Sequence, residues 1–206
     1  MINFSYIENK IPDVGLYDLM TDKNFDWYYN DNTLGDNFES SISNIEDSSQ
    51  FVHVFFNKYR SVNQDAYAEK AMMLLPYIEN NLGVKIKGIN RIKGNMLLNK
   101  TNWSTEKYHP PHYDEKTNNF MSVLYYVNDS DGDTLIFDKN YPSEPKNMKI
   151  LARYQPKKGA CAIFNSTIYH ASCNPINSNK RISMSHFSGL SNIFIIMFII
   201  TICNNK

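Results

Sequence analysis

Two side chains that commonly bind transition metals stand two residues apart near the middle of the chain. They are His112 and Asp114, and an apolar stretch with the composition of a β-strand follows them at residues 120–127. In an extended strand, residues i and i+2 point to the same face. An imidazole nitrogen and a carboxylate oxygen would then meet at one point, with Tyr113 turned the other way. This pair supplies two of the three ligands of a two-histidine, one-carboxylate facial site, which leaves coordination positions open on Fe(II).

The third ligand is expected to be a distant histidine on another strand, and His170 is the best placed. It follows a buried-strand pattern at residues 160–164. Further along, alternation over residues 181–185 puts Arg181 and Ser183 on one face. An arginine with a hydroxyl two residues on is a suitable bidentate clamp for a carboxylate. The sequence therefore predicts a metal centre with an anion-binding group near it.

With these positions in view, the chain resembles the Fe(II)- and 2-oxoglutarate-dependent dioxygenases, in particular the branch around the prolyl 4-hydroxylase catalytic domains. The resemblance covers roughly residues 95–187. Its motifs follow the order of the family: His112-x-Asp114, residues 125–128, 131–137, 156–159 and 162–164, then His170 and Arg181-x-Ser183. A lone His-x-Asp pair is common by chance, whereas this ordered set is specific.

The resemblance implies a cofactor set and a role for each residue of the site. It implies Fe(II), 2-oxoglutarate as cosubstrate, O2, and ascorbate as an accessory reductant. The implied metal ligands are His112, Asp114 and His170. The far carboxylate of 2-oxoglutarate would bind Arg181, with Ser183 as a helper and with Tyr126, which occupies the position of a tyrosine that holds this carboxylate in prolyl-hydroxylase-like members. The implied reaction is hydroxylation of a peptidyl or small-molecule C–H bond, with release of succinate and CO2.

Two other functions stay open. One is a non-catalytic jelly roll that binds a metal or a ligand, for example a viral or cell-surface interaction module. The complete triad together with Arg181 and Tyr126 argues against it, because a retired site would be free to lose some of them. The other is a cupin-like enzyme that uses another metal without 2-oxoglutarate, in which Arg181 would have no purpose. Neither the motifs nor the fold identify the substrate.

Composition limits the kinds of partner and compartment. The 206 residues suit one domain with a sizeable core. Lysine plus arginine and aspartate plus glutamate both number 21, so the formal charge is zero and gives no electrostatic case for nucleic acid or an anionic membrane as partner. The three cysteines, Cys161, Cys173 and Cys203, are too few and too scattered for a disulfide framework or a zinc motif, and no signal-peptide pattern is visible. We therefore expect a reducing, cytoplasmic setting and a small-molecule, peptide or protein substrate.

The spacing of apolar residues predicts a mainly β protein with flanking helices. Strands are predicted near residues 107–112, 120–127, 134–138, 149–154, 160–164, 168–171 and 181–187. Seven short strands without intervening helices indicate a double-stranded β-helix, or jelly roll. We expect one domain in which residues 99–187 form the jelly-roll core, residues 1–98 support it, and residues 188–206 form an apolar tail.

The clearest helix is predicted at residues 63–82. Ser61 and Gln64 can form a capping box at its start, and Gly83 supplies a left-handed stop. Pro76 is expected to kink it. We expect this helix to pack against one face of a sheet.

Flanking segments complete the prediction. A strand is expected at 50–56, and one or two strands at 84–98, whose lysines and arginines are better explained by a solvated sheet face than by phosphate binding. Aromatic residues at 25–29 are expected to pack onto the sheet, with the alternative that Trp27 or Tyr29 lines the substrate entrance. The apolar run at 193–203 is shorter than the about 20 residues of a membrane span, so a buried strand or short helix is expected and an interfacial anchor is the alternative.

The remaining histidines are predicted to be structural. They are His53, His109 and His186. His109 does not repeat the metal-binding pattern because the residue two positions on is a proline, and His186 has the opposite parity to Arg181 on the same strand. Asn165 and Asn174 flank His170, either as its hydrogen-bond partners or as loop residues.

Overall fold

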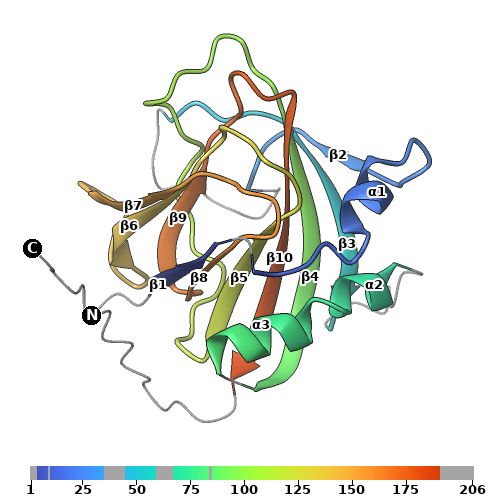
Figure 1. Ribbon diagram of the computed structural model, residues 1–206. Coiled ribbons are helices and arrows are strands. Elements are labelled where there is room, and N and C mark those ends of the chain that lie inside the picture. The colour runs from blue at the N-terminus through green and yellow to red at the C-terminus, as the bar shows by residue number, and fades with distance from the viewer. Residues whose placement is uncertain (1–3, 9, 35–44, 59–66, 84, 191–206) are drawn as a thin grey trace, which may run out of the picture.

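Two antiparallel sheets form the body of the protein in the computed structural model, which describes residues 4–8, 10–34, 45–58, 67–83 and 85–190 (Figure 1). The larger sheet has the strand order β1-β8-β5-β10-β4-β3-β2, and the smaller sheet has the order β7-β6-β9. The strands are β1 (Phe4–Ile7), β2 (Tyr28–Asn30), β3 (Gln50–Asn57), β4 (Ile86–Leu98), β5 (Phe120–Tyr126), β6 (Thr134–Asn140), β7 (Ile150–Tyr154), β8 (Cys161–Asn165), β9 (Ile168–Ser172) and β10 (Lys180–Leu190). The helices are α1 (Leu16–Thr21), α2 (Ala68–Met72) and α3 (Leu75–Leu82).

The order of the strands confirms the predicted jelly roll. From β5 onward the chain passes between the two sheets, with β5, β8 and β10 in the larger sheet and β6, β7 and β9 in the smaller one. All of their pairings are antiparallel. The predicted strands at 50–56, 120–127, 134–138, 149–154, 160–164, 168–171 and 181–187 are confirmed as β3 and β5 to β10.

Alternation along β10 separates the two sides of the larger sheet. Ile182 and Met184 are fully buried in an apolar cluster that includes Leu74 and Ile78 of the α2–α3 region. Arg181 and Ser183, which alternate with these two residues along β10, therefore point to the other side, toward the smaller sheet. The helices thus cover the outer face of the larger sheet (Figure 1), and the polar positions of β10 face the interior.

A second apolar cluster lies between the sheets. It joins Tyr126 and Phe164 of the larger sheet to Ile136 and Ile168 of the smaller one. This packing holds the two sheets together. The part of the space between them that the cluster does not fill contains a pocket lined by polar side chains.

The strand predicted at 107–112 is wrong. Only a single bridge pairs His112 with His170 there. Pro110 and Pro111 explain the difference, because proline has no N–H to donate to a ladder. The bridge still brings His112 beside β9, which is the feature that matters for the site.

The single helix predicted at 63–82 is two helices, α2 and α3, with a break at residues 73–74. Pro76 lies in the first turn of α3, where its missing N–H is tolerated. Gly83 ends α3 with φ of 65°, as predicted. Ser61 and Gln64 lie outside the described residues.

The N-terminal half contributes more strands than expected. Where one or two strands were predicted at 84–98, the structure has the one strand β4, which pairs with β10 from Ile86 to Leu98. The strands β1 and β2 were not predicted. No helix within the described segments is long and apolar enough to cross a membrane, and the run at 193–203 lies outside them.

Candidate metal centre and its pocket

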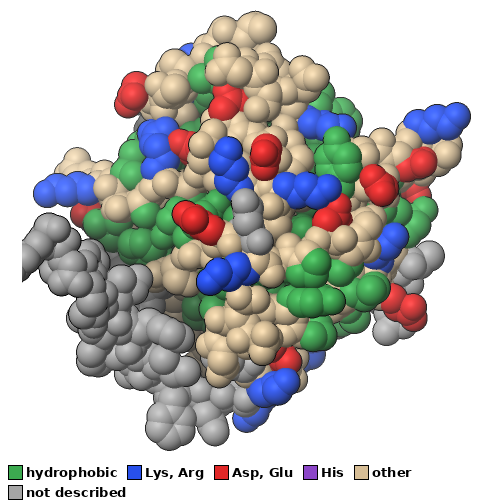
Figure 2. Space-filling model, viewed as in Figure 1, with side chains coloured by type: hydrophobic (Ala, Val, Ile, Leu, Met, Phe, Trp, Pro, Cys, Tyr) green, Lys and Arg blue, Asp and Glu red, His purple; other side chains and the backbone are tan. Residues whose placement is uncertain are grey.

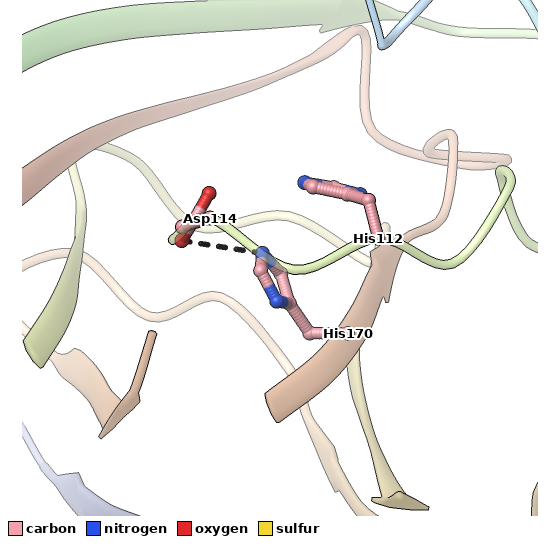
Figure 3. A group of neighbouring side chains, drawn as sticks. All are labelled: His112, Asp114 and His170. Carbon is pink, nitrogen blue, oxygen red and sulfur yellow. Dashed lines mark ion pairs between the residues drawn. The ribbon is translucent and has the colours of Figure 1, made fainter. Parts of the chain in front are cut away.

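Three side chains from two segments converge on one point between the sheets (Figure 3). The N–H of His112 donates to the carbonyl of His170 at 2.9 Å, and the reverse bond is 2.8 Å. Two residues on, the N–H of Asp114 donates to the carbonyl of Ser166 at 2.8 Å. These bonds fix the backbone so that ligand atoms of His112, Asp114 and His170 lie within 4.8 Å of one another.

Each imidazole is positioned for metal binding. Nδ1 of His170 lies 3.0 Å from the carbonyl oxygen of Ile168 and donates its proton to it, which leaves Nε2 as the nitrogen that faces the site. That Nε2 lies 3.6 Å from Oδ2 of Asp114, the contact drawn in Figure 3. Burial, and then the neighbouring His170, lowers the pKa of His112 to about 3. His112 is therefore neutral at physiological pH, the state in which imidazole binds a metal.

Asp114 is held by a partner that the sequence did not reveal. The hydroxyl of Ser122, on β5, donates to Oδ2 of Asp114 at 2.6 Å. Ser122 is buried in a strand whose other side chains are largely apolar. A hydroxyl in such a place orients the carboxylate, as outer hydrogen-bond partners of metal ligands do.

Replacing Ser122 with Ala should weaken metal binding by roughly 10- to 100-fold, because the carboxylate loses the bond that orients it. Calorimetric titration with Mn(II) would measure the change. Ser185→Ala is the matched control: Ser185 also lines the pocket, but its hydroxyl donates to the carbonyl of Lys93. Equal losses in both variants would contradict the assigned role.

Arg181 lies in the same pocket and is almost completely buried, with 3% of its surface exposed. Its Nη2 donates to Oγ1 of Thr134 at 2.7 Å, and its Nη1 donates to Oγ of Ser183 at 3.3 Å. The hydroxyl of Tyr126 donates to the same Thr134 oxygen at 2.9 Å. Arg181, Ser183 and Tyr126 thus lie together in one network, in which Thr134 bonds Arg181 and Tyr126 and Arg181 bonds Ser183.

The guanidinium of Arg181 lacks a counter-ion among the described residues. Its Nε has no hydrogen-bond partner, and no aspartate or glutamate in the described part of the chain forms an ion pair with it. Burial lowers the pKa of Arg181. A buried unpaired cation is costly, so the arrangement fits an anionic ligand.

The sequence did not predict a role for Thr134 in the site, because the residue falls within the strand predicted at 134–138. It begins β6 and is followed by three buried apolar residues. A polar residue that opens an otherwise apolar strand was the available signal.

Two more cations line the pocket, so the prediction of a solvated sheet face was wrong for Arg91 and Lys93, although Lys85 and Lys87 are exposed. Arg91 and Lys93, both on β4, face the pocket, whereas Lys87 on the same strand is exposed. Burial and then the charge of Arg91 lower the pKa of Lys93 to about 8, while Asp114 opposes the shift.

The other histidines, His53, His109 and His186, lie outside the group of metal ligands. His53 bonds the carbonyl of Asp26 through Nδ1 at 2.7 Å, and His109 lies 3.0 Å from Asp47 and 3.2 Å from Asn174. His186 is fully buried, and burial lowers its pKa to about 4.

The flanking asparagines and the aromatic segment have roles away from the metal ligands. Asn174 bonds His109, and Asn165 bonds Asn118 and Thr167, so neither holds His170. Trp27 packs against the core and Tyr29 is 60% exposed; neither lines the pocket.

Comparison with known proteins agrees with this geometry. The sequence profile of the 2OG-Fe(II) oxygenase superfamily matches residues 96–189. No curated protein matches the sequence significantly.

The solved structures that share the fold include the following three. A non-heme, alpha-ketoglutarate-dependent epimerase, SnoN of nogalamycin biosynthesis, is 10% identical with a TM-score of 0.56, over 91% of this chain and 78% of that one. A Pseudomonas putida prolyl-4-hydroxylase is 14% identical with a TM-score of 0.51, over 92% and 94%. A Trichoplax adhaerens prolyl hydroxylase, in complex with a hypoxia inducible factor oxygen degradation domain peptide fragment, is 16% identical with a TM-score of 0.52, over 90% and 83%.

A jelly roll with two histidines and a carboxylate at one point, and a buried arginine in the same pocket, defines an iron- and 2-oxoglutarate-dependent oxygenase. The chain matches the 2OG-Fe(II) oxygenase superfamily over residues 96–189, and it shares its fold with prolyl hydroxylases. It is an oxidoreductase whose cofactors are Fe(II), 2-oxoglutarate and O2. The donor set suits the metal, and the orphaned Nε of Arg181 suits the cosubstrate.

Proposed function

We propose that this dioxygenase hydroxylates a C–H bond of a peptidyl or small-molecule substrate. The observation that carries the proposal is the buried, uncompensated Arg181 in the same pocket as the triad of His112, Asp114 and His170. In the balanced reaction, 2-oxoglutarate, O2 and the substrate give succinate, CO2 and the alcohol. The bound iron and cosubstrate supply the activation of O2.

The chain itself would bind and orient the metal and 2-oxoglutarate and keep water out of the pocket. His112, Asp114 and His170 would hold the metal, with the carboxylate reducing its net charge. Arg181 and the Thr134 and Ser183 hydroxyls would bind the far carboxylate of 2-oxoglutarate, with Tyr126 supporting Thr134. Phe164 lines the pocket wall beside them and limits access of water.

The proposed substrate is a peptide or a small molecule. The structure of the similar Trichoplax enzyme contains a bound peptide fragment, and the similar epimerase SnoN comes from nogalamycin biosynthesis. We further propose a cytoplasmic location, with ascorbate as accessory reductant. Buried, unpaired Cys161 and Cys173 support a reducing compartment.

Adding Fe(II) and 2-oxoglutarate without oxygen should produce a metal-to-ligand charge-transfer band. Absence of the band at saturating cosubstrate would refute the assignment of 2-oxoglutarate to this site. Screening peptides and free amino acids for stimulated succinate release, followed by mass spectrometry of the product, then tests hydroxylation. A product without an added oxygen atom would contradict the hydroxylase proposal while leaving the oxygenase class intact.

A further inference from the structure

The inner face of β4 places a second cationic group beside the metal centre. Lys93 pairs with Ser185 of β10, and Ser185 pairs in turn with Leu124 of β5. All three line the pocket, together with Asp114. Arg181 stands four residues before Ser185 on β10, so the two cationic groups belong to different levels of the sheet.

The proposed cofactors leave this second group uncompensated. Iron(II) and Arg181 together carry three positive charges, and Asp114 with the two carboxylates of 2-oxoglutarate carries three negative charges. These charges cancel. Lys93 remains, and among the described residues that line the pocket Asp114 is the only carboxylate.

Lys93 is mostly buried, and its Nζ forms no hydrogen bond or ion pair with any residue in the described segments. Cations on the exposed surface are in a different setting: on the face seen in Figure 2, acidic and basic side chains are interspersed. Lys93 is partly shielded from water and lacks an anionic partner among the described residues, so an anionic ligand in the pocket would stabilise its charge.

We propose that Lys93, with Arg91 beside it, binds an anionic oxygen group of the substrate, a carboxylate or a phosphate, and thereby holds the substrate next to the metal. The inference rests on the proposed function, because it assigns this pocket to the substrate. Asn95, the next inward-facing residue of β4, adds an amide that can donate to the same group. A charge-assisted bond in this sheltered position gives both affinity and orientation.

Calorimetry on the Mn(II)- and 2-oxoglutarate-loaded protein tests the proposal, with inorganic phosphate and acetate as probes at constant ionic strength. We expect Lys93→Gln to weaken binding of the preferred anion by roughly tenfold or more, and Lys93→Arg to retain most of it. Lys87→Gln is the control, because it removes an exposed lysine from the same strand. Stronger binding of phosphate would point to a phosphorylated substrate, and stronger binding of acetate to a carboxylate.

Two results would overturn the anion site: neither probe binds the wild-type protein, or Lys93→Gln binds as well as wild type. A third result would assign Lys93 to the cosubstrate and not to the substrate, namely a loss of 2-oxoglutarate binding in Lys93→Gln as large as in an Arg181 variant. The anaerobic charge-transfer band, measured on the Fe(II) forms, separates the two proposals. An intact band with unchanged anion binding counts only against the Lys93 site, whereas a missing wild-type band counts against the proposed function.

Discussion

Asp114→Ala should abolish turnover and lower affinity for Fe(II) or Mn(II) by more than the roughly 100-fold upper range for the loss of an outer hydrogen-bond partner. Asp114 is the one carboxylate of the triad, and its removal leaves two imidazoles, which carry no negative charge. The metal would lose both a ligand and the negative charge that reduces its net charge. Metal titration by calorimetry would measure the effect.

Asp114→Asn separates the two contributions, because the amide keeps the size of the side chain and removes its charge. We expect a loss close to that of Asp114→Ala. Asp18→Ala, an exposed aspartate of α1, is the control and should bind metal as wild type does. Metal affinity that survives in Asp114→Asn alone would show that the negative charge is not needed, and affinity that survives in both variants would show that the carboxylate is not a ligand.

The convergence of the triad was predictable although one element that carries it was not. The pairing of His112 and Asp114 was inferred from an extended strand, and two prolines reduce that strand to a bridge. The side chains still meet because three backbone hydrogen bonds fix residues 112–114 against His170 and Ser166. The order of the motifs was sufficient to choose His170 from the other histidines.

The partners of these residues could not be predicted, because they depend on cross-strand register. Ser122 reaches Asp114 only because β5 runs beside the segment that carries the ligands. Lys93 enters the pocket because β4 pairs with β10, a contact between distant parts of the sequence. Alternation alone gives the two faces of a strand, and it does not tell which face will be enclosed by the other sheet.

Replacing Arg181 should weaken 2-oxoglutarate binding by about 100-fold or more and leave metal affinity without cosubstrate nearly unchanged. Truncating one member of a buried charge pair typically costs about 2–5 kcal/mol, and each 1.4 kcal/mol corresponds to a factor of about ten. Arg181→Met is the preferred variant because it fills most of the volume. Arg181→Lys keeps the charge and loses the planar fork, so an intermediate loss of roughly tenfold is expected.

The same variant gives an independent reading of stability. Arg181 is buried without an anionic partner among the residues described, so Arg181→Met should raise the unfolding midpoint of the cofactor-free protein. Anaerobic titration of the charge-transfer band and thermal unfolding would measure the two effects on one preparation. Weaker cosubstrate binding together with greater stability of the free protein would mean that Arg181 is retained for its ligand. Equal weakening of iron and 2-oxoglutarate would instead show that the arginine supports the metal site, and a destabilised variant would show that it supports the fold.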